Sequence, residues 1–283
     1  MSPALVAARA GLSRGWIEFR QTLATPRDLI SILITTGTLL AVMIWTRHTH
    51  VPGTRFSLGT ATLVSVLALD VVHYGVVNMG DLIVAEREDG TLLRAKAIPN
   101  GMLGYLLGNV VSFSMQIAFV FAIILLAGAL LFTGLAVGSP GNWLTLAWVL
   151  ALGLLATLPL GAVLGSLFPS QRIAGPWWLL LLGGLAAISG IFYPITHLPM
   201  FLQWTGQVFP VYWLGLGMRS ALLPNAMASV ELGHSWRHLA TFGVLSAWAV
   251  AGLVLAPAVL RRMARRQSGS AVAARREKAM QGA

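Results

Sequence analysis

The most highly charged segment between two apolar runs of this chain reads Glu86-Arg87-Glu88-Asp89-Gly90-Thr91-Leu92-Leu93-Arg94-Ala95-Lys96-Ala97-Ile98-Pro99. It places six charged side chains, three acidic and three basic, in eleven positions of a protein that is only 10% charged. Long apolar runs stand on both sides of it. Because its charge is balanced in sign, it is not a simple basic membrane anchor. We predict that it lies in the cytoplasm between two membrane spans and binds another protein.

The composition of the 283-residue chain is that of a membrane protein. Apolar residues make up 57% of it, whereas a soluble domain has about 45–50% apolar and about 25% charged residues. Several runs reach the roughly 20 apolar residues that are needed to cross about 30 Å of hydrocarbon. The sequence therefore predicts an all-α integral membrane protein.

Charge and motifs exclude several other classes of protein. The net charge is +10, but most Lys and Arg flank the apolar runs, which is the orientation signal of membrane proteins rather than a nucleic-acid surface. The chain has no cysteine and no P-loop or dinucleotide fingerprint. We therefore expect no metal site, no bound cofactor, no nucleic-acid partner and no enzymatic activity in this chain.

The charge distribution favours six transmembrane helices with both termini in the cytoplasm. The six runs cover about 29–46, 56–79, 102–132, 143–168, 175–192 and 239–260. With this topology, 15 of the 19 Lys and Arg residues lie inside and four lie outside. A seventh span would move the seven basic residues beyond position 260 to the outside, which the positive-inside rule disfavours.

Three regions follow from this topology. Residues 1–28 are predicted to form a cytoplasmic amphipathic elbow helix in the membrane plane, because Leu12, Trp16, Phe19 and Leu23 repeat at helical spacing. We expect Trp16 at headgroup level. Residues 29–260 form the six-span transmembrane domain, and residues 261–283 form a basic cytoplasmic tail.

The segment 194–223 is apolar, but it is not predicted to be a span. Pro194, Pro199 and Pro210 interrupt it, and each proline removes a helix hydrogen-bond donor. We expect a pair of short re-entrant helices that dip into the outer leaflet before the last span. Its aromatic residues, Trp204, Tyr212 and Trp213, are expected at the membrane interface.

The second span contains several polar and ionisable residues, which is unusual within an apolar run. At 100° per residue, one side of the helix carries Asp70, His73, Tyr74, Asn78 and Asp81. A lone carboxylate that faces lipid costs about 3 kcal/mol or more, so Asp70 must face protein, water or a partner. Two interpretations remain open: a buried Asp70–His73 pair that pins the bundle or a dimer, or the wall of a translocation path.

Small residues recur at helical spacing in two places. Gly104-x-x-x-Gly108 and Gly161-x-x-x-Gly165 predict close helix packing within the bundle. The segment 11–15, Gly-Leu-Ser-Arg-Gly, matches the G-x-S-x-G pattern of hydrolases. That motif requires a preceding strand, whereas this one lies in a predicted helix, so we assign Ser13 no nucleophilic role.

The charged segment 86–99 is predicted to lie in a coupling loop that covers residues 81–101. The second-span helix continues to residue 89 and ends at Gly90, because glycine tolerates left-handed geometry. Thr91 then caps a short helix at 92–97, and Pro99 marks the start of the third span. The side chains expected to remain available to a partner are Glu86, Glu88, Asp89, Arg94 and Lys96.

Two motifs resemble those of ABC-2 type transporter permeases. Residues 86–92 with Pro99 are similar to the E-R-E-x-G-T-L…P signature between the second and third spans of that family. The run Ser189-Gly190-Ile191-Phe192-Tyr193-Pro194, with Leu198-Pro199 and Phe209-Pro210-Val211-Tyr212, resembles the S-G-x-x-x-P…L-P…P-x-x-Y run after the fifth span. The segment 25–28, Thr-Pro-Arg-Asp, departs from the family's common Arg-Asp-Pro.

The resemblance implies the membrane subunit of an ABC exporter in the cell membrane. Two separate ATP-binding subunits would hold ATP and Mg, and a second permease copy or a sister permease would complete the transporter. In the family the loop is the coupling helix, which assigns coupling to Glu86, Arg87, Glu88, Asp89, Gly90, Thr91 and Arg94. The turn at Arg172 would make a minor second contact. The outer re-entrant motif comprises Gly190, Pro194, Pro199, Pro210 and Tyr212.

The family's exporters move drugs, antibiotics, lipids or polysaccharides. An amphipathic drug-like molecule, an antibiotic or a lipid is the expected cargo, and a polysaccharide-exporting permease of the same family is the first alternative. The second alternative is an ion-coupled secondary transporter that uses Asp70 and His73. Many such transporters contain inverted repeats, and the sequence shows no such symmetry.

Overall fold

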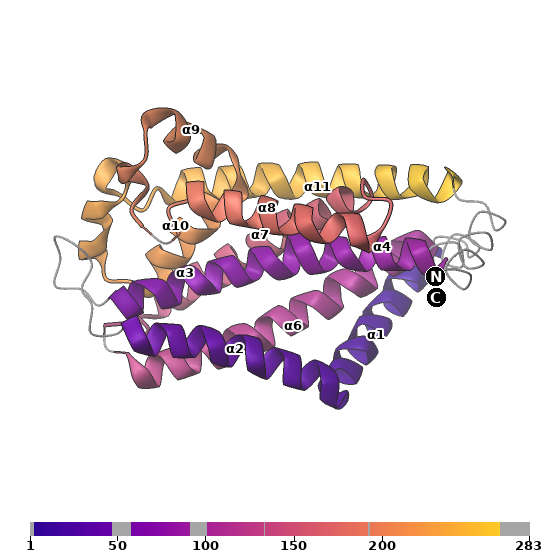
Figure 1. Ribbon diagram of the computed structural model, residues 1–283, viewed down its shortest axis with the longest axis horizontal. Coiled ribbons are helices and arrows are strands. Elements are labelled where there is room, and N and C mark those ends of the chain that lie inside the picture. The colour runs from indigo at the N-terminus through magenta and orange to yellow at the C-terminus, as the bar shows by residue number, and fades with distance from the viewer. Residues whose placement is uncertain (1–2, 47–57, 91–100, 133, 192, 267–283) are drawn as a thin grey trace.

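A computed structural model describes residues 3–46, 58–90, 101–132, 134–191 and 193–266 (Figure 1). Within these ranges the chain forms helices and connecting turns, without a strand. The longer helices are α1 (Pro3–Ala24), α2 (Pro26–Thr46), α3 (Leu58–Val72), α4 (Met79–Asp89), α6 (Gly101–Leu131), α7 (Pro140–Gly165), α8 (Gln171–Ile188), α9 (Met200–Val208), α10 (Pro210–Leu222) and α11 (His238–Arg266). The shorter ones are η1 (His73–Asn78), η2 (Ile195–His197), η3 (Asn225–Val230) and η4 (Leu232–His234).

Four helices of the described part of the chain are long and apolar enough to cross a membrane. They cover Gly59–Asp89, Gly104–Leu131, Pro140–Gly165 and His238–Met263. These ranges match the predicted second, third, fourth and last spans, so the prediction of an all-α membrane protein is confirmed. The other two predicted spans correspond to α2 and α8, which run along the same bundle (Figure 1).

The second span is a continuous helical segment made of three parts. The π-helix η1 joins α3 to α4 without a break in helical geometry. At about 1.5 Å per residue, the 31 residues of Gly59–Asp89 extend to about 46 Å. A hydrocarbon core is only about 30 Å thick. The segment is therefore longer than a membrane span requires.

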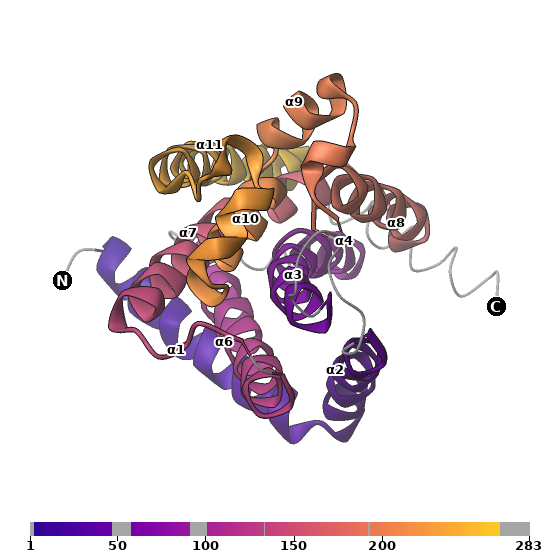
Figure 2. The ribbon, with the colours of Figure 1, turned by 90° about the vertical axis from the view of Figure 1, so that its left-hand side faces the viewer.

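The helices pack around α3 and α7. Figure 2 shows α3 in the middle of the bundle, with α2, α6, α8 and α10 around it. Helix α7 contacts α3, η1, α4, α10 and α11. The core contains fully buried aliphatic side chains from several of these helices, among them Leu63, Leu67, Ile117, Val149 and Leu214.

Paired glycines set two of the closest helix contacts, as the small-residue patterns predict. A Cβ on Gly161 would lie 2.2 Å from the Gly75 oxygen, and one on Gly165 would lie 2.4 Å from the Gly80 oxygen. Only residues without a side chain permit α7 to approach the second span so closely.

Helix α1, the predicted elbow, packs on α6 through a second set of glycines. A Cβ on Gly11 would lie 2.5 Å from the Gly104 oxygen, and one on Gly15 would lie 2.5 Å from the Gly108 oxygen. The G-x-S-x-G pattern is thus a helix-packing surface. The predicted apolar stripe is a different face of α1, on which Leu12 and Trp16 are exposed and Phe19 contacts α6 through the Phe119 ring.

The segment before α11 folds as two short helices, α9 and α10, as expected from its prolines. All thirteen residues of α10 are buried. The expectation that Tyr212 and Trp213 lie at a membrane interface is therefore wrong, because α10 inserts between α3, α7 and α11. Trp204 of α9 is exposed, as are Met200, Phe201 and Val208.

Candidate functional site

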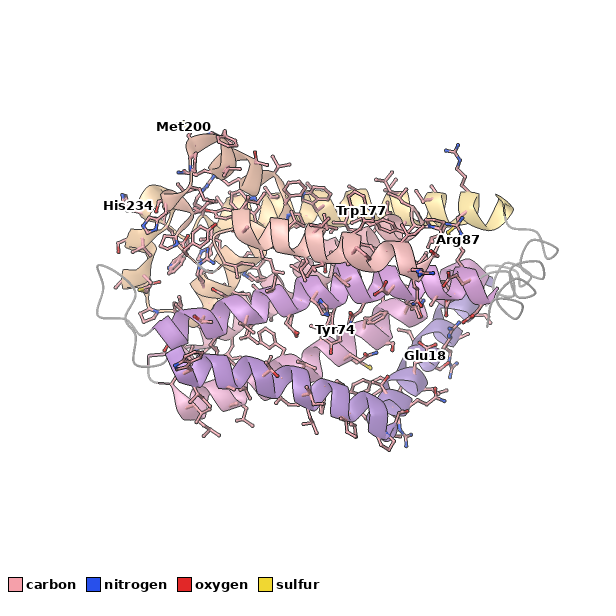
Figure 3. The ribbon with its side chains drawn as sticks, viewed as in Figure 1. Glu18, Tyr74, Arg87, Trp177, Met200 and His234 are labelled. Atoms are coloured by element: carbon pink, nitrogen blue, oxygen red, sulfur yellow. The ribbon has the colours of Figure 1, made fainter. Side chains whose placement is uncertain are left out.

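The structure describes four charged residues of the segment 86–99, and they lie at the end of α4: Glu86, Arg87, Glu88 and Asp89. This end of the bundle is here called the α4 end. The end of α4, the start of α6, the helix α1 and the turn between α7 and α8 meet there (Figure 1). Figure 3 shows Glu18 and Arg87 at this end, whereas Met200 and His234 lie at the opposite end, here called the α9 end.

Helix α4 ends as the sequence predicts. Gly90 has φ 77° and ψ 10°, a left-handed conformation that closes the helix after Asp89. Asp89 is exposed and Glu88 is half-buried, so both lie at the surface of this end. Thr91, Arg94, Lys96, the predicted helix 92–97 and Pro99 lie outside the described residues.

Glu86 contacts helix α1 rather than pointing outward, which differs from the expectation. Its side chain is 14% exposed, and its Oε1 lies 3.7 Å from Arg14 Nη2. Arg14 also donates from Nε to Glu18 Oε1 at 2.6 Å, and its guanidinium lies 5.4 Å from the centre of the Tyr105 ring. Glu86 therefore connects α4 to both α1 and α6.

The acidic neighbours Glu18 and Glu86 stabilise the charged form of Arg14. Partial burial acts to lower the pKa of Arg14, but the hydrogen bond and charge of Glu18, together with the charge of Glu86, outweigh it and raise the pKa above its usual value. The guanidinium consequently stays charged wherever the protein is folded. The cation between these two carboxylates therefore connects α1 to α4.

Two polar residues of α6 extend this contact into the bundle, and the sequence reasoning missed them. Tyr105 and Asn109 are buried, and the Tyr105 hydroxyl lies beside the Glu86 carboxylate and the Asn109 amide. Tyr105 Oη, Asn109 Nδ2 and Glu86 Oε2 each lack a hydrogen-bond partner of good geometry. The available signal was the helical spacing of Tyr105, Asn109, Ser112 and Gln116 in an apolar run.

Arg87 lies on the other side of α4 and contacts the turn between α7 and α8. Its Nη1 donates to the carbonyl oxygens of Phe168, at 3.1 Å, and Ser166, at 3.4 Å. One helical turn and a half earlier, Asp81 Oδ1 accepts a 2.7 Å hydrogen bond from Trp178 Nε1. Arg172 stands exposed in the first turn of α8, at the same end of the molecule.

The polar residues of the second span lie together only in part as predicted. Asp70 is 7% exposed, and its Oδ2 lacks a hydrogen-bond partner. The His73 ring instead meets Tyr74 edge-on, with ring centres 6.0 Å apart; Figure 3 shows Tyr74 near the middle of the long helix. Asn78 is half-buried at the end of η1. The π-helical turn changes the 100° spacing on which the predicted single-sided stripe depended.

The residues of the outer motif lie together at the α9 end. Gly190 has φ 65°, so it reverses the chain after α8 in a conformation that favours glycine. Pro199 precedes α9, and Pro210 begins α10, which are positions where a missing N–H costs no helix bond. Pro194 precedes η2, and Tyr212 is fully buried.

A buried ion pair that the sequence did not predict holds this end together. Arg219 Nε lies 2.6 Å from Glu231 Oε1, and Nη2 lies 3.3 Å from Oε2. Arg219 Nη1 also donates to the Gly190 oxygen at 3.4 Å. One guanidinium therefore connects α10, the loop after η3 and the turn after α8.

The model of the family described as ABC-2 type transporter matches residues 12–223. The chain belongs to the ABC-2 type transporter family. No curated protein matches the chain. The match begins within α1 and ends just after α10, so it contains the contacts of Glu86 and Arg87 and the whole outer motif.

Membership in the ABC-2 family places the chain among transport proteins of membranes. An ABC-2 permease is not catalytic by itself, and permeases of this family typically work with ATP-binding subunits. The residues above are thus candidates for contacts with such subunits and with cargo, rather than for chemistry on a bound substrate.

The ABC-2 permease has a cavity of about 180 Å³ at the α9 end. Its walls come from the first turns of α3, the segment Gly190–His197 and the segment between Arg219 and Glu231. Ile191, Pro194 and Met227 make much of it apolar, and the Arg219–Glu231 pair contributes its charged side. The cavity therefore combines an apolar wall with a fixed ion pair.

Proposed function

We propose that this chain is the membrane subunit of an ATP-driven exporter that moves an amphipathic small molecule, such as a drug or antibiotic, or a lipid out of the cell. Two separate ATP-binding subunits, which hold ATP and Mg, supply the energy. A second copy of the chain or a sister permease completes the membrane part. Family membership supports an ATP-driven mechanism over the ion-coupled alternative.

In this proposal the α4 end is cytoplasmic and the α9 end faces outward. The six spans are α2, the segment α3–η1–α4, α6, α7, α8 and α11, with α1 as the elbow and α9 and α10 as the outer re-entrant helices. The start of α1 and the end of α11 lie at the α4 end (Figure 1). The basic pair Arg261 and Arg262 near the end of α11 fits the positive-inside rule.

One observation supports a coupling role for residues 86–90. The end of α4 contacts the elbow through Glu86 and the α7–α8 turn through Arg87. A push on α4 from a docked ATP-binding subunit therefore reaches α1, α6 and α7 by direct contacts. Glu88 and Asp89, at the surface, are the proposed docking residues, together with Arg94 and Arg172.

Charge reversal at Glu86 and Glu88 tests this role. The permease is reconstituted with its ATP-binding subunit, and the ATPase rate is compared with and without the permease. We expect Glu86→Arg/Glu88→Arg to abolish the stimulation of ATPase activity while membrane insertion stays intact. Glu277→Arg, in the basic tail, adds positive charge as a control and should leave stimulation unchanged. Normal stimulation in the double variant would contradict the role.

The nature of the cargo is tested separately. A drug-like or lipid cargo fits a bundle whose described spans are apolar apart from a few polar groups such as Asp70. Transport assays with fluorescent amphiphiles, lipids and oligosaccharides distinguish the two exporter classes. Transport of oligosaccharides alone would favour the polysaccharide-exporting alternative.

A further inference from the structure

Arg87 closes the end of a helix to which it does not belong. The last carbonyl groups of an α-helix have no partner within the helix, and a cation near them is stabilising. Helix α7 ends at Gly165, and Ser166 follows it. Arg87 Nη1 reaches the Ser166 oxygen at 3.4 Å and the Phe168 oxygen at 3.1 Å. Helix α4 thus supplies the positive charge that closes α7.

The same turn is held by a second contact with α4. Trp178 of α8 donates to Asp81 Oδ1 at 2.7 Å, and its ring meets Phe168 edge-on, with centres 5.0 Å apart. The Trp178 ring also lies against Gly80, where an added Cβ would come within 2.5 Å of it. Phe168 therefore has two contacts: Arg87 binds its carbonyl oxygen, and Trp178 packs against its ring.

We propose that Arg87 is a positioning residue that ties the α7–α8 turn, residues 166–172, to the end of α4. The proposal rests on the proposed function. With the tie in place, the stretch 86–90 and the turn that carries Arg172 form one rigid receiving surface for the ATP-binding subunit. Without it, a push on α4 moves α4 and the elbow but leaves α7 and α8 behind. Arg87 then transmits motion, whereas Glu88 and Asp89 provide docking.

A distance measurement on the permease alone tests the tie. The chain has no cysteine, so spin labels can be placed uniquely at Glu88→Cys and Leu167→Cys, and Leu167 is exposed. Double electron–electron resonance should give a narrow distance distribution in the parent. We expect Arg87→Ala to broaden it and Arg172→Ala, the matched control, to leave it narrow. An unchanged distribution in Arg87→Ala would overturn the proposal.

The functional arm separates transmission from docking. We expect Arg87→Ala to lower the maximal stimulated ATPase rate about tenfold, which corresponds to about 1.4 kcal/mol, while the concentration of ATP-binding subunit at half-maximal stimulation changes little. Arg87→Lys keeps the charge but not the fork of donors, and should recover part of the rate. A change in half-maximal concentration alone would assign Arg87 to docking and overturn the transmission role.

A second variant covers the case in which Arg87→Ala does not fold. If Arg87→Ala fails to fold, Trp178→Phe removes the Nε1 donor to Asp81 together with the part of the indole that lies against Gly80, and should broaden the same distance distribution to a smaller extent. An unchanged distribution in Trp178→Phe would then contradict the tie. A parent permease that stimulates no ATP-binding subunit would overturn the proposed function, whereas the distance measurement still decides on the tie itself.

Discussion

The two ends of the bundle each contain an arginine–glutamate pair, but the pairs differ in distance and burial. At the α9 end, Arg219 and Glu231 are both 7% exposed and approach to 2.6 Å. At the α4 end, Arg14 and Glu86 are 3.7 Å apart, and the Arg14 side chain is 40% exposed. The α9 pair also binds a backbone carbonyl, whereas the α4 pair shares its arginine with Glu18.

The difference indicates which end is built to move. A buried, close ion pair is expensive to break because each partner alone is an uncompensated buried charge. A longer, partly exposed pair contributes little to stability and can be broken and remade at small cost. We therefore expect the α9 end to be a fixed cap and the α4 end to be the adjustable part at which a partner can act. The free energy of unfolding in detergent provides one scale on which both ends can be compared.

Loss of the α9 pair should have the largest effect. Arg219→Ala leaves Glu231 buried without its cation, and we expect the free energy of unfolding to fall by about 3–5 kcal/mol. Thermal unfolding followed by circular dichroism measures this loss. The charge-free control Arg219→Met/Glu231→Leu should recover most of it, and a double variant as unstable as the single one would remove the contrast between the ends.

A methyl group at the elbow contact should have an intermediate effect. Gly15→Ala places a Cβ 2.5 Å from the Gly108 oxygen of α6, and such overpacking costs about 1–3 kcal/mol. Gly37→Ala in α2 is the control, because nothing lies within 4 Å of the added carbon. The same unfolding measurement should find Gly37→Ala neutral or slightly stabilising. Equal stability of the two variants would show that α1 does not dock through its glycines.

Loss of the α4 pair should change stability little and function more. Arg14→Ala is expected to cost up to about 1 kcal/mol, because the pair is partly exposed and long. The stimulated ATPase rate should nevertheless fall, since α4 then lacks its charged contact with the elbow. A stability loss as large as that of Arg219→Ala would mean that both ends are fixed caps.

The smallest stability effect is expected at Asp70. Because Asp70 Oδ2 has no hydrogen-bond partner, Asp70→Asn keeps the shape and should change the free energy of unfolding by less than about 1 kcal/mol. If Asp70 lies on the transport path, the relative transport rates of cationic and neutral amphiphiles should change in this variant. Loss of folded protein without a change in selectivity would instead assign Asp70 a structural role.

The features that the sequence predicted are those that depend on local properties. Long apolar runs predicted the helices, Gly90 predicted the left-handed end of α4, and the spaced glycines predicted two close helix contacts. Each depends on length, backbone conformation or side-chain size within one segment. None requires knowledge of which segment lies opposite.

The features that were missed depend on a partner in another element. Glu86 was expected to face outward, but the position of α1 across α6 brings Arg14 to it. Tyr212 and Trp213 were placed at an interface because aromatic residues favour it, but the bundle buries α10 completely. The Arg219–Glu231 pair joins α10 to a loop beyond η3, and no helical spacing indicates it.

Transport by the reconstituted permease, measured with and without its ATP-binding subunits, shows whether ATP-binding subunits supply the energy. Proteoliposomes that contain both should accumulate a fluorescent amphiphile when ATP is added. Proteoliposomes that contain the permease alone should show no transport, with or without an imposed proton or sodium gradient. Gradient-driven transport by the permease alone would contradict the account, because the energy would then enter through the membrane rather than through the end of α4.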